Sequence, residues 1–248
     1  MFPIRDHNPS GRTPYVTYSL IAINVAVFVA YWYGLQNENA LNDFFYTFGL
    51  VPQIVLSGHN LPSLITHMFL HGGWMHLAGN MLFLWIFGDN LEDLMGHAKF
   101  LVFYILAGLA AAALQIAVDP ASLAPMVGAS GAIAGVLGGY LLLFPKARVD
   151  VVLILIIFFK VFTIRAWIVL CLWFGMQLFS GFATPSQDGG VAYFAHIGGF
   201  IAGLVLCFPM WRGLGGTAFW QETLGKPAHP AAEYQVGKSR IPRVIRRS

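Results

Sequence analysis

Six long apolar runs, separated by more polar segments, dominate the hydropathy pattern of the chain. They extend approximately over residues 15–34, 73–91, 98–118, 126–144, 166–183 and 191–211. A helix needs about 20 residues to cross roughly 30 Å of hydrocarbon, and each run is close to this length. The pattern therefore predicts six membrane-spanning helices.

A seventh apolar segment, VDVVLILIIFF at residues 149–159, is too short for a crossing. As a helix it would reach only about 16 Å at 1.5 Å per residue. We therefore expect residues 151–160 to lie at the membrane interface or to form an early turn of the fifth helix.

Composition supports a membrane environment. Hydrophobic residues make up 57% of the chain and charged residues only 10%, and the mean hydropathy is +0.67. Soluble proteins average about 25% charged residues, so an ordinary soluble domain is excluded. The expected fold is an all-α polytopic membrane protein. Residues 1–14 would form an N-terminal segment, residues 15–211 the six-helix core, and residues 212–248 a basic, flexible tail.

The positions of the cations predict the orientation. Lysine and arginine are absent from the loops at 35–62, 119–125 and 184–190. They gather before the first run, between the fourth and fifth runs, and in the tail, at Arg5, Arg12, Lys146, Arg148, Lys160, Arg165 and from Lys226 to Arg247. By the positive-inside rule both termini are cytoplasmic. We expect an integral protein of a bacterial inner membrane.

A lone serine, Ser130, stands between two glycines near the start of the fourth run, in MVGASGAIAGVLGGYLLLF. A serine in a membrane helix commonly bonds to a carbonyl one turn earlier, so Ser130 alone predicts no chemistry. The predicted topology places it about one turn below the outer surface. A stripe of glycines beside it would allow another helix to approach closely.

The sixth run, which reads AYFAHIGGFIAG, supplies a histidine at a matching depth. His196, Gly199 and Gly203 fall on one helical face, and this helix also begins at the outer side. Histidines inside membranes are costly and are functional candidates by default. We therefore expect His196 to come within hydrogen-bond reach of Ser130.

The second run adds two polar groups to this side of the membrane. His76 and Asn80 are four residues apart, share one helical face, and can both donate hydrogen bonds. Serine hydrolysis of an amide needs a nucleophile, a base, and donors for the developing oxyanion. No acidic residue lies near His196 in the sequence except Asp188 in a loop, so the pattern favours a Ser–His dyad over a triad.

The segments HMFLHGGWMHLAGNMLF, GASGAIAG and AHIGGFIAG occur in this order, and with them the chain resembles the rhomboid intramembrane serine proteases. The resemblance covers residues 15–211. It implies that Ser130 is the nucleophile, that His196 is the general base and then acid, and that His76, Asn80 and the Ser130 backbone N–H form the oxyanion hole. It also implies that Glu92 ties the second helix to its neighbours.

The resemblance further implies cleavage of peptide bonds in or next to transmembrane segments, near the outer surface. The partners would be single-span or polytopic membrane proteins and membrane lipids. No metal, nucleotide or other cofactor would be required. We expect no binding of nucleic acid, because the basic tail is short and accompanies no folded module.

Two positions depart from the family pattern. Many relatives have a tyrosine one turn after the serine that packs under the histidine, whereas this chain has Ala134. Tyr193 or Phe200 are the candidates to orient the His196 ring instead. The Trp-Arg pair of the first outer loop is also replaced, since the residues before Thr66 read NLPSLI.

Two alternatives remain open at this stage. His67, His71 and His76, together with His196, could form a transition-metal or haem site. We expect instead that His67 and His71 are loop residues that bond to the backbone. The second alternative is a rhomboid-like binding protein without catalytic activity.

Overall fold

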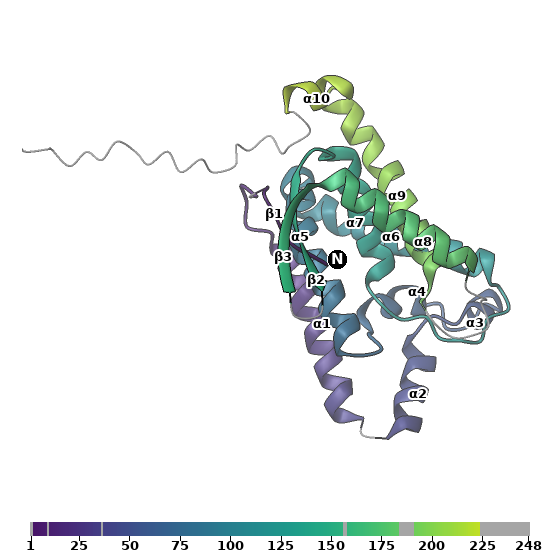
Figure 1. The fold of residues 1–248 in the computed structure, drawn as a ribbon. Helices are drawn as coiled ribbons and strands as arrows, with labels where there is room; N and C mark the ends of the chain where they lie inside the picture. Colours follow the sequence, from purple (N-terminus) through teal and green to yellow (C-terminus); the bar gives the residue numbers. More distant parts are fainter. Residues whose placement is uncertain (1, 9, 36, 156–157, 184–190, 224–248) are drawn as a thin grey trace, which may run out of the picture.

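The computed structural model describes residues 2–8, 10–35, 37–155, 158–183 and 191–223. Helices dominate this part of the chain, and each of the six apolar runs contains one long helix (Figure 1). These are α1 (Tyr15–Gly34), α5 (Trp74–Met95), α6 (His97–Val118), α7 (Ser130–Leu143), α8 (Ala166–Ala183) and α9 (Tyr193–Gly213).

Four of these helices, α1, α6, α8 and α9, are long and apolar enough to cross a membrane. The chain is therefore an integral membrane protein. Helix α7 is apolar but only 14 residues long, and α5 carries Asp89, Glu92 and Asp93 near its C-terminal end.

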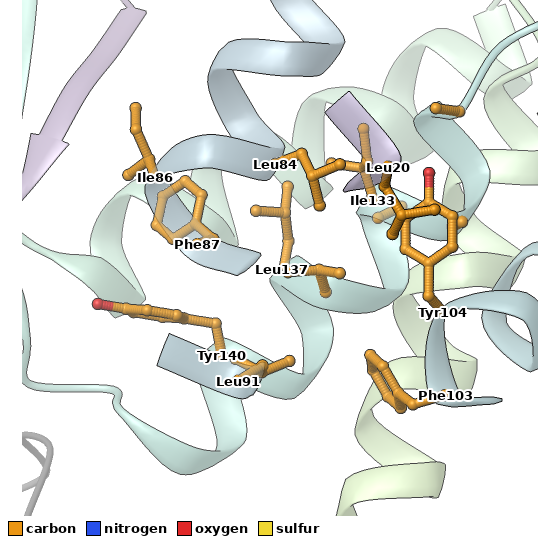
Figure 2. Packing of buried hydrophobic residues seen from close by; sticks show 14 of the residues in the cluster. Leu20, Leu84, Ile86, Phe87, Leu91, Phe103, Tyr104, Ile133, Leu137 and Tyr140 are labelled. Carbon is orange, nitrogen blue, oxygen red and sulfur yellow. The ribbon is translucent and has the colours of Figure 1, made fainter. Parts of the chain in front are cut away.

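Helix α7 lies at the centre of the bundle and packs against α5, α6 and α9 (Figure 1). Eleven of its 14 residues are buried. Figure 2 shows apolar residues of α1, α5, α6 and α7 meeting in one cluster. In this cluster the Phe87 ring of α5 packs edge-on against the Tyr140 ring of α7, with centroids 4.9 Å apart. Ser130 thus begins a helix that lies within the buried apolar core.

Glycines allow α7 and α9 to touch backbone to backbone. A Cβ atom on Gly199 would overlap the carbonyl oxygen of Gly131, and one on Gly203 would overlap that of Gly135. Small residues at such crossings are typical of membrane helices, because contact then depends on close packing. The glycine stripes expected from the sequence are therefore confirmed as the contact between these two helices.

Replacing Gly203 with alanine is expected to lower the melting temperature of the purified protein in detergent by about 5 °C or more, because the added methyl group forces α7 and α9 apart. The matched control is Gly175→Ala on α8, where a Cβ meets no atom within 4 Å. That variant should melt at or above the wild-type temperature. Equal melting temperatures for the two variants would contradict this account of the helix contact.

Glu92 joins the C-terminal end of α5 to the start of α1 and of α6. Its carboxylate accepts hydrogen bonds from the backbone N–H groups of Val16 and Thr17 at 2.8 and 2.7 Å, and from the Thr17 hydroxyl at 2.7 Å. His97, the first residue of α6, is 2.5 Å from the same carboxylate. A carboxylate at a helix N-terminus satisfies free N–H groups and the helix dipole. The expectation that Glu92 ties the second long helix to its neighbours is confirmed.

The protein also contains a three-stranded antiparallel sheet in the order β1–β2–β3, formed by β1 (Phe2–Asp6), β2 (Arg148–Leu155) and β3 (Phe158–Arg165). Phe2 pairs with Val152, and Arg148 pairs with Arg165. Asp150 of β2 links the other two strands, because its carboxylate accepts hydrogen bonds from Arg5 of β1 at 2.9 Å and from Thr163 of β3 at 2.7 Å. The sheet follows the C-terminal end of α7, so it lies at the opposite end of this helix from Ser130.

This sheet corrects two expectations. The fold is mostly helical rather than all-α, and residues 151–155 and 158–160 belong to strands rather than to a turn of the fifth helix. This segment is rich in valine and isoleucine, which favour strands over helices. The pairing of β1 with β2 also attaches residues of the 1–14 segment to the segment that precedes α8.

The connection between α1 and α5 folds into short helices. These are α2 (Glu38–Phe48), α3 (Pro52–Leu56), α4 (Ser63–Thr66) and the 3₁₀ turn η1 (His67–Phe69). After α9, a short helix α10 (Thr217–Glu222) follows, and the Trp220 indole N–H donates to the Leu142 carbonyl at 2.9 Å. The basic tail from Lys226 to Arg247 lies outside the described residues.

Candidate active site

Ser130 is the first residue of α7, not a residue one turn inside a longer helix. The fourth apolar run begins at residue 126, but the helix begins later because Gly128 has φ +133°, a conformation that interrupts the helix before Ser130. The N-cap residue, Ala129, makes no side-chain capping bond. The Ser130 N–H belongs to the first turn, where helices leave their N–H groups without intrahelical partners. This N–H and the Ser130 hydroxyl are therefore presented together at a helix N-terminus.

The segment before Ser130 is fixed by backbone pairing. Leu50 and Met126 form an antiparallel bridge, with N···O distances of 2.9 and 2.8 Å. The Gly128 N–H donates to the His67 carbonyl at 2.9 Å. These bonds connect the start of α7 to the chain around α3, α4 and η1, which fixes the position of the Ser130 hydroxyl.

His196 meets Ser130 as the sequence predicts. Its Nε2 atom is 2.8 Å from Ser130 Oγ, which is hydrogen-bonding distance. His196 lies in the first turn of α9, where Gln115 of α6 accepts a bond from the Ala195 N–H at 3.2 Å. Gly199, about one turn after His196 in α9, contacts the α7 backbone. This contact fixes the depth of the imidazole relative to Ser130.

The other side of the His196 ring is held by α8. Its Nδ1 atom is 2.7 Å from Gln177 Oε1, and the Trp173 ring lies beside it with centroids 5.8 Å apart. Sequence reasoning missed both residues. The signal that could have found Gln177 is a lone amide in a long apolar run, which is unfavourable in lipid unless it has a partner.

Neither residue proposed from the sequence to orient this ring has a ring contact with it among the described residues. Phe200 stacks instead on Phe174, with centroids 4.4 Å apart. Tyr193 packs beside Gly181, where a Cβ would lie 3.3 Å from Tyr193 Cβ. Ala134 is fully buried. Asp188, the loop carboxylate considered from the sequence, lies outside the described residues.

His76, in the first turn of α5, also lies close to Ser130. A Cβ on Gly128 would be 2.8 Å from His76 Nε2 and 3.4 Å from Ser130 Oγ, so both atoms lie close to this glycine. The Gly72 N–H donates to His76 Nδ1 at 3.3 Å. Because Nδ1 accepts this bond, a neutral His76 ring carries its proton on Nε2, the nitrogen that lies close to Gly128.

Asn80 lies one turn after His76 on the same face of α5. The side chain is buried, and its Nδ2 atom has no hydrogen-bond partner within the described residues. A buried amide without a partner costs about 1–3 kcal/mol. Such a donor is expected where a ligand or a reacting group supplies the missing acceptor.

His67 and His71 are buried, but they do not form a ligand set. His67 Nδ1 donates to the Ser63 carbonyl at 2.8 Å, as expected for a loop histidine that bonds to the backbone. The expectation fails for His71. Its backbone N–H donates to the Tyr31 hydroxyl, but neither ring nitrogen has a hydrogen-bond partner among the described residues. Burial lowers the pKa of His67 to about 4 and that of His71 to about 3. Over the described ranges, no three His, Cys, Asp or Glu side chains are grouped to hold a metal ion.

Comparison with known proteins gives one consistent result. The chain matches the family model of the Rhomboid domain over residues 58–213. It is 30% identical over 199 residues to Rhomboid protein 1, mitochondrial, of Saccharomyces cerevisiae, which covers 77% of this chain and 51% of the yeast protein. It is 29% identical over 198 residues to Rhomboid protease GluP of Bacillus subtilis, covering 79% of this chain and 36% of that protein.

Rhomboid protease GlpG of Salmonella paratyphi A is 28% identical over 147 residues, covering 58% of this chain and 46% of its own length. The chain thus spans about half, or less, of the length of these relatives.

Proposed function

Because the chain belongs to the rhomboid family, we propose that it is an intramembrane serine protease that cleaves with Ser130 as nucleophile and His196 as base. The single observation that best supports this is the 2.8 Å separation between Ser130 Oγ and His196 Nε2 at the N-terminus of α7. The names of two relatives, each a rhomboid protease, agree with the proposal.

The proposed reaction begins with attack of Ser130 Oγ on the carbonyl carbon of the scissile peptide bond. The hydroxyl proton passes to His196 Nε2, and the carbonyl oxygen becomes an oxyanion. The imidazolium then protonates the leaving amine as the C–N bond breaks, which leaves an acyl-enzyme on Ser130. Attack by a water molecule, with His196 again as base, releases the new carboxylate and restores the serine.

We propose three donors to the oxyanion that develops during this attack. They are the Ser130 N–H at the positive end of the α7 dipole, His76 Nε2–H, and the unpartnered Asn80 amide. Donors fixed in a water-poor site stabilise a developing charge strongly, because they need no reorganisation. We assign them the role of the oxyanion hole.

In this proposal all six long helices cross the membrane, α5 and α7 included. Helix α7 is about 21 Å long, whereas the hydrocarbon layer is about 30 Å thick, so Ser130 would lie below one membrane surface. Both termini would face the cytoplasm of a bacterium, in its inner membrane, and the site would open to the outer side. Substrates would be single-span or polytopic membrane proteins, with lipids around the bundle.

The proposal is tested with the purified protein in detergent and a single-span test substrate. We expect cleavage in or next to the substrate's transmembrane segment, mapped by mass spectrometry, and covalent labelling of Ser130 by a fluorophosphonate. EDTA should leave the rate unchanged, because His196 already supplies the base that the reaction needs.

The same experiment separates the alternatives. Absence of both cleavage and labelling would favour a binding protein without catalytic activity. Loss of cleavage with EDTA, restored by zinc, would favour a metal-dependent reaction. The proposed nucleophile would be wrong if the fluorophosphonate labelled a residue other than Ser130.

A further inference from the structure

Helix α8 carries one amide side chain, Gln177, and one hydroxyl, Ser180, in an otherwise apolar sequence without charged residues. Its outward side chains are large and apolar, and Leu172, Met176, Phe179 and Phe182 are all more than half exposed. Gln177 points the other way and reaches His196 Nδ1 at 2.7 Å. The amide therefore has a specific partner, and that partner is the proposed general base.

The packing of α8 on α9 places this amide. Phe174, three residues before Gln177, stacks on Phe200, and Trp173 lies against both Phe200 and His196. Gly181, one turn after Gln177, lets α8 approach Tyr193 closely. These contacts lie on one face of α8 at three- and four-residue spacing, with Gln177 between them. The hydrogen bond to His196 is thus built into the contact between two helices.

The atoms in this bond determine which nitrogen of His196 holds the proton. The Gln177 carbonyl oxygen can only accept, so His196 Nδ1 must carry the hydrogen. In a neutral imidazole Nε2 then has a free lone pair, which can accept the proton of Ser130 Oγ. If the Gln177 amide nitrogen faced His196 instead, the proton would sit on Nε2 and the ring could not act as a base toward serine.

We propose that Gln177 is the positioning residue that fixes the tautomer and the orientation of the His196 ring. The inference rests on the proposed function, and it assigns Gln177 the place that a carboxylate has in a Ser–His–Asp triad. A neutral amide stabilises the imidazolium less than a carboxylate, but it selects the same tautomer. It also accounts for the buried alanine, Ala134, because the ring is held from the side of α8.

The test compares three variants of the full-length protein in detergent. Gln177→Leu removes the acceptor at similar size, and Gln177→Glu keeps an acceptor oxygen in reach of Nδ1. Met176→Leu is the matched control, since the Met176 side chain, next to Gln177 in the sequence, is 59% exposed and faces away from the site. For Gln177→Leu we expect kcat to fall roughly 10- to 100-fold with KM nearly unchanged. Gln177→Glu should retain most of kcat, and Met176→Leu all of it.

A second measurement reads the tautomer directly and needs no substrate. In protein labelled with ¹⁵N-histidine, nitrogen NMR distinguishes protonated from unprotonated ring nitrogens, and the His196 signals are assigned by their loss in His196→Ala. We expect Nδ1–H and a free Nε2 in the wild type and in Gln177→Glu, and a shift toward Nε2–H in Gln177→Leu. A merely structural role of Gln177 would not move this signature.

Three results would overturn the inference: Nε2–H in the wild type, an unchanged tautomer in Gln177→Leu, or a wild-type kcat in that variant. Failure of the proposed function gives a different result, because then the wild type does not cleave, or Ser130→Ala still does. The NMR result is independent of cleavage, so the two failures are distinguishable.

Discussion

Replacing Ser130 or His196 with alanine is expected to lower the rate of substrate cleavage by at least about 10⁴-fold, and the double variant should be no slower than either single one. The reason is that Ser130 Oγ and His196 Nε2, 2.8 Å apart, act as one unit, so loss of either atom leaves no activated nucleophile. The measurement is the initial rate of cleavage of a single-span substrate under identical detergent conditions.

The chain offers a matched control for this pair. Ser57 and His59 also form a serine–histidine hydrogen bond, with Oγ 3.1 Å from Nδ1, but both side chains are exposed. Alanine at these two positions should leave cleavage unchanged. A double variant that loses the sum of the two single losses in activation free energy, or turnover by Ser130→Ala, would contradict the proposed chemistry.

The positions of the long helices follow closely from the sequence, because a membrane allows so few backbone structures. An apolar run of about 20 residues must satisfy its own N–H and C=O groups in lipid, and a helix does so within one segment. The predicted run at 15–34 therefore has the bounds of α1. The weak points are the helix starts, which depend on local backbone conformation. Gly128 moves the start of α7 from residue 126 to Ser130, and only its positive φ reveals this.

The hairpin of β2 and β3 was missed for a related reason. Its apolar residues were assigned by length alone, and 11 residues are too few for a spanning helix. The strands satisfy their backbone by pairing with each other and with β1, which lies more than 140 residues earlier in the chain. Pairing over this separation leaves no local signal apart from the β-branched residues.

The candidate site was predicted where motifs mark it, and missed where single residues do. Ser130 and His196 stand among glycines whose spacing indicates a close helix contact, and the structure brings them together. Gln177 and Gln115 lie outside any such motif, yet both hold the start of α9 in place. Their roles depend on which face of α6 and α8 meets α9, and six similar apolar helices could be arranged in many ways.

Alanine at His76 or at Asn80 is expected to lower kcat by roughly 10- to 1000-fold, with little change in KM, because each removes one donor to the oxyanion. The double variant should lose at least as much kcat as the more affected single variant. Asn80→Ala carries a second expectation. Because the Asn80 amide has no partner within the described residues, its removal should leave the melting temperature unchanged or raise it. Loss of rate without loss of stability is the signature of a group held ready for the transition state.

Asn24 is the matched control for Asn80. It is also a buried asparagine in a long helix, but its amide donates to the Leu20 carbonyl of its own helix at 2.8 Å. Asn24→Ala should therefore keep its kcat, whereas Asn80→Ala loses rate. Labelling of Ser130 by a fluorophosphonate should slow in the His76 and Asn80 variants, since the reagent also develops a negative oxygen during attack. If the His76→Ala, Asn80→Ala double variant cleaved at the wild-type rate, these residues would serve helix packing alone, and the oxyanion assignment would be wrong.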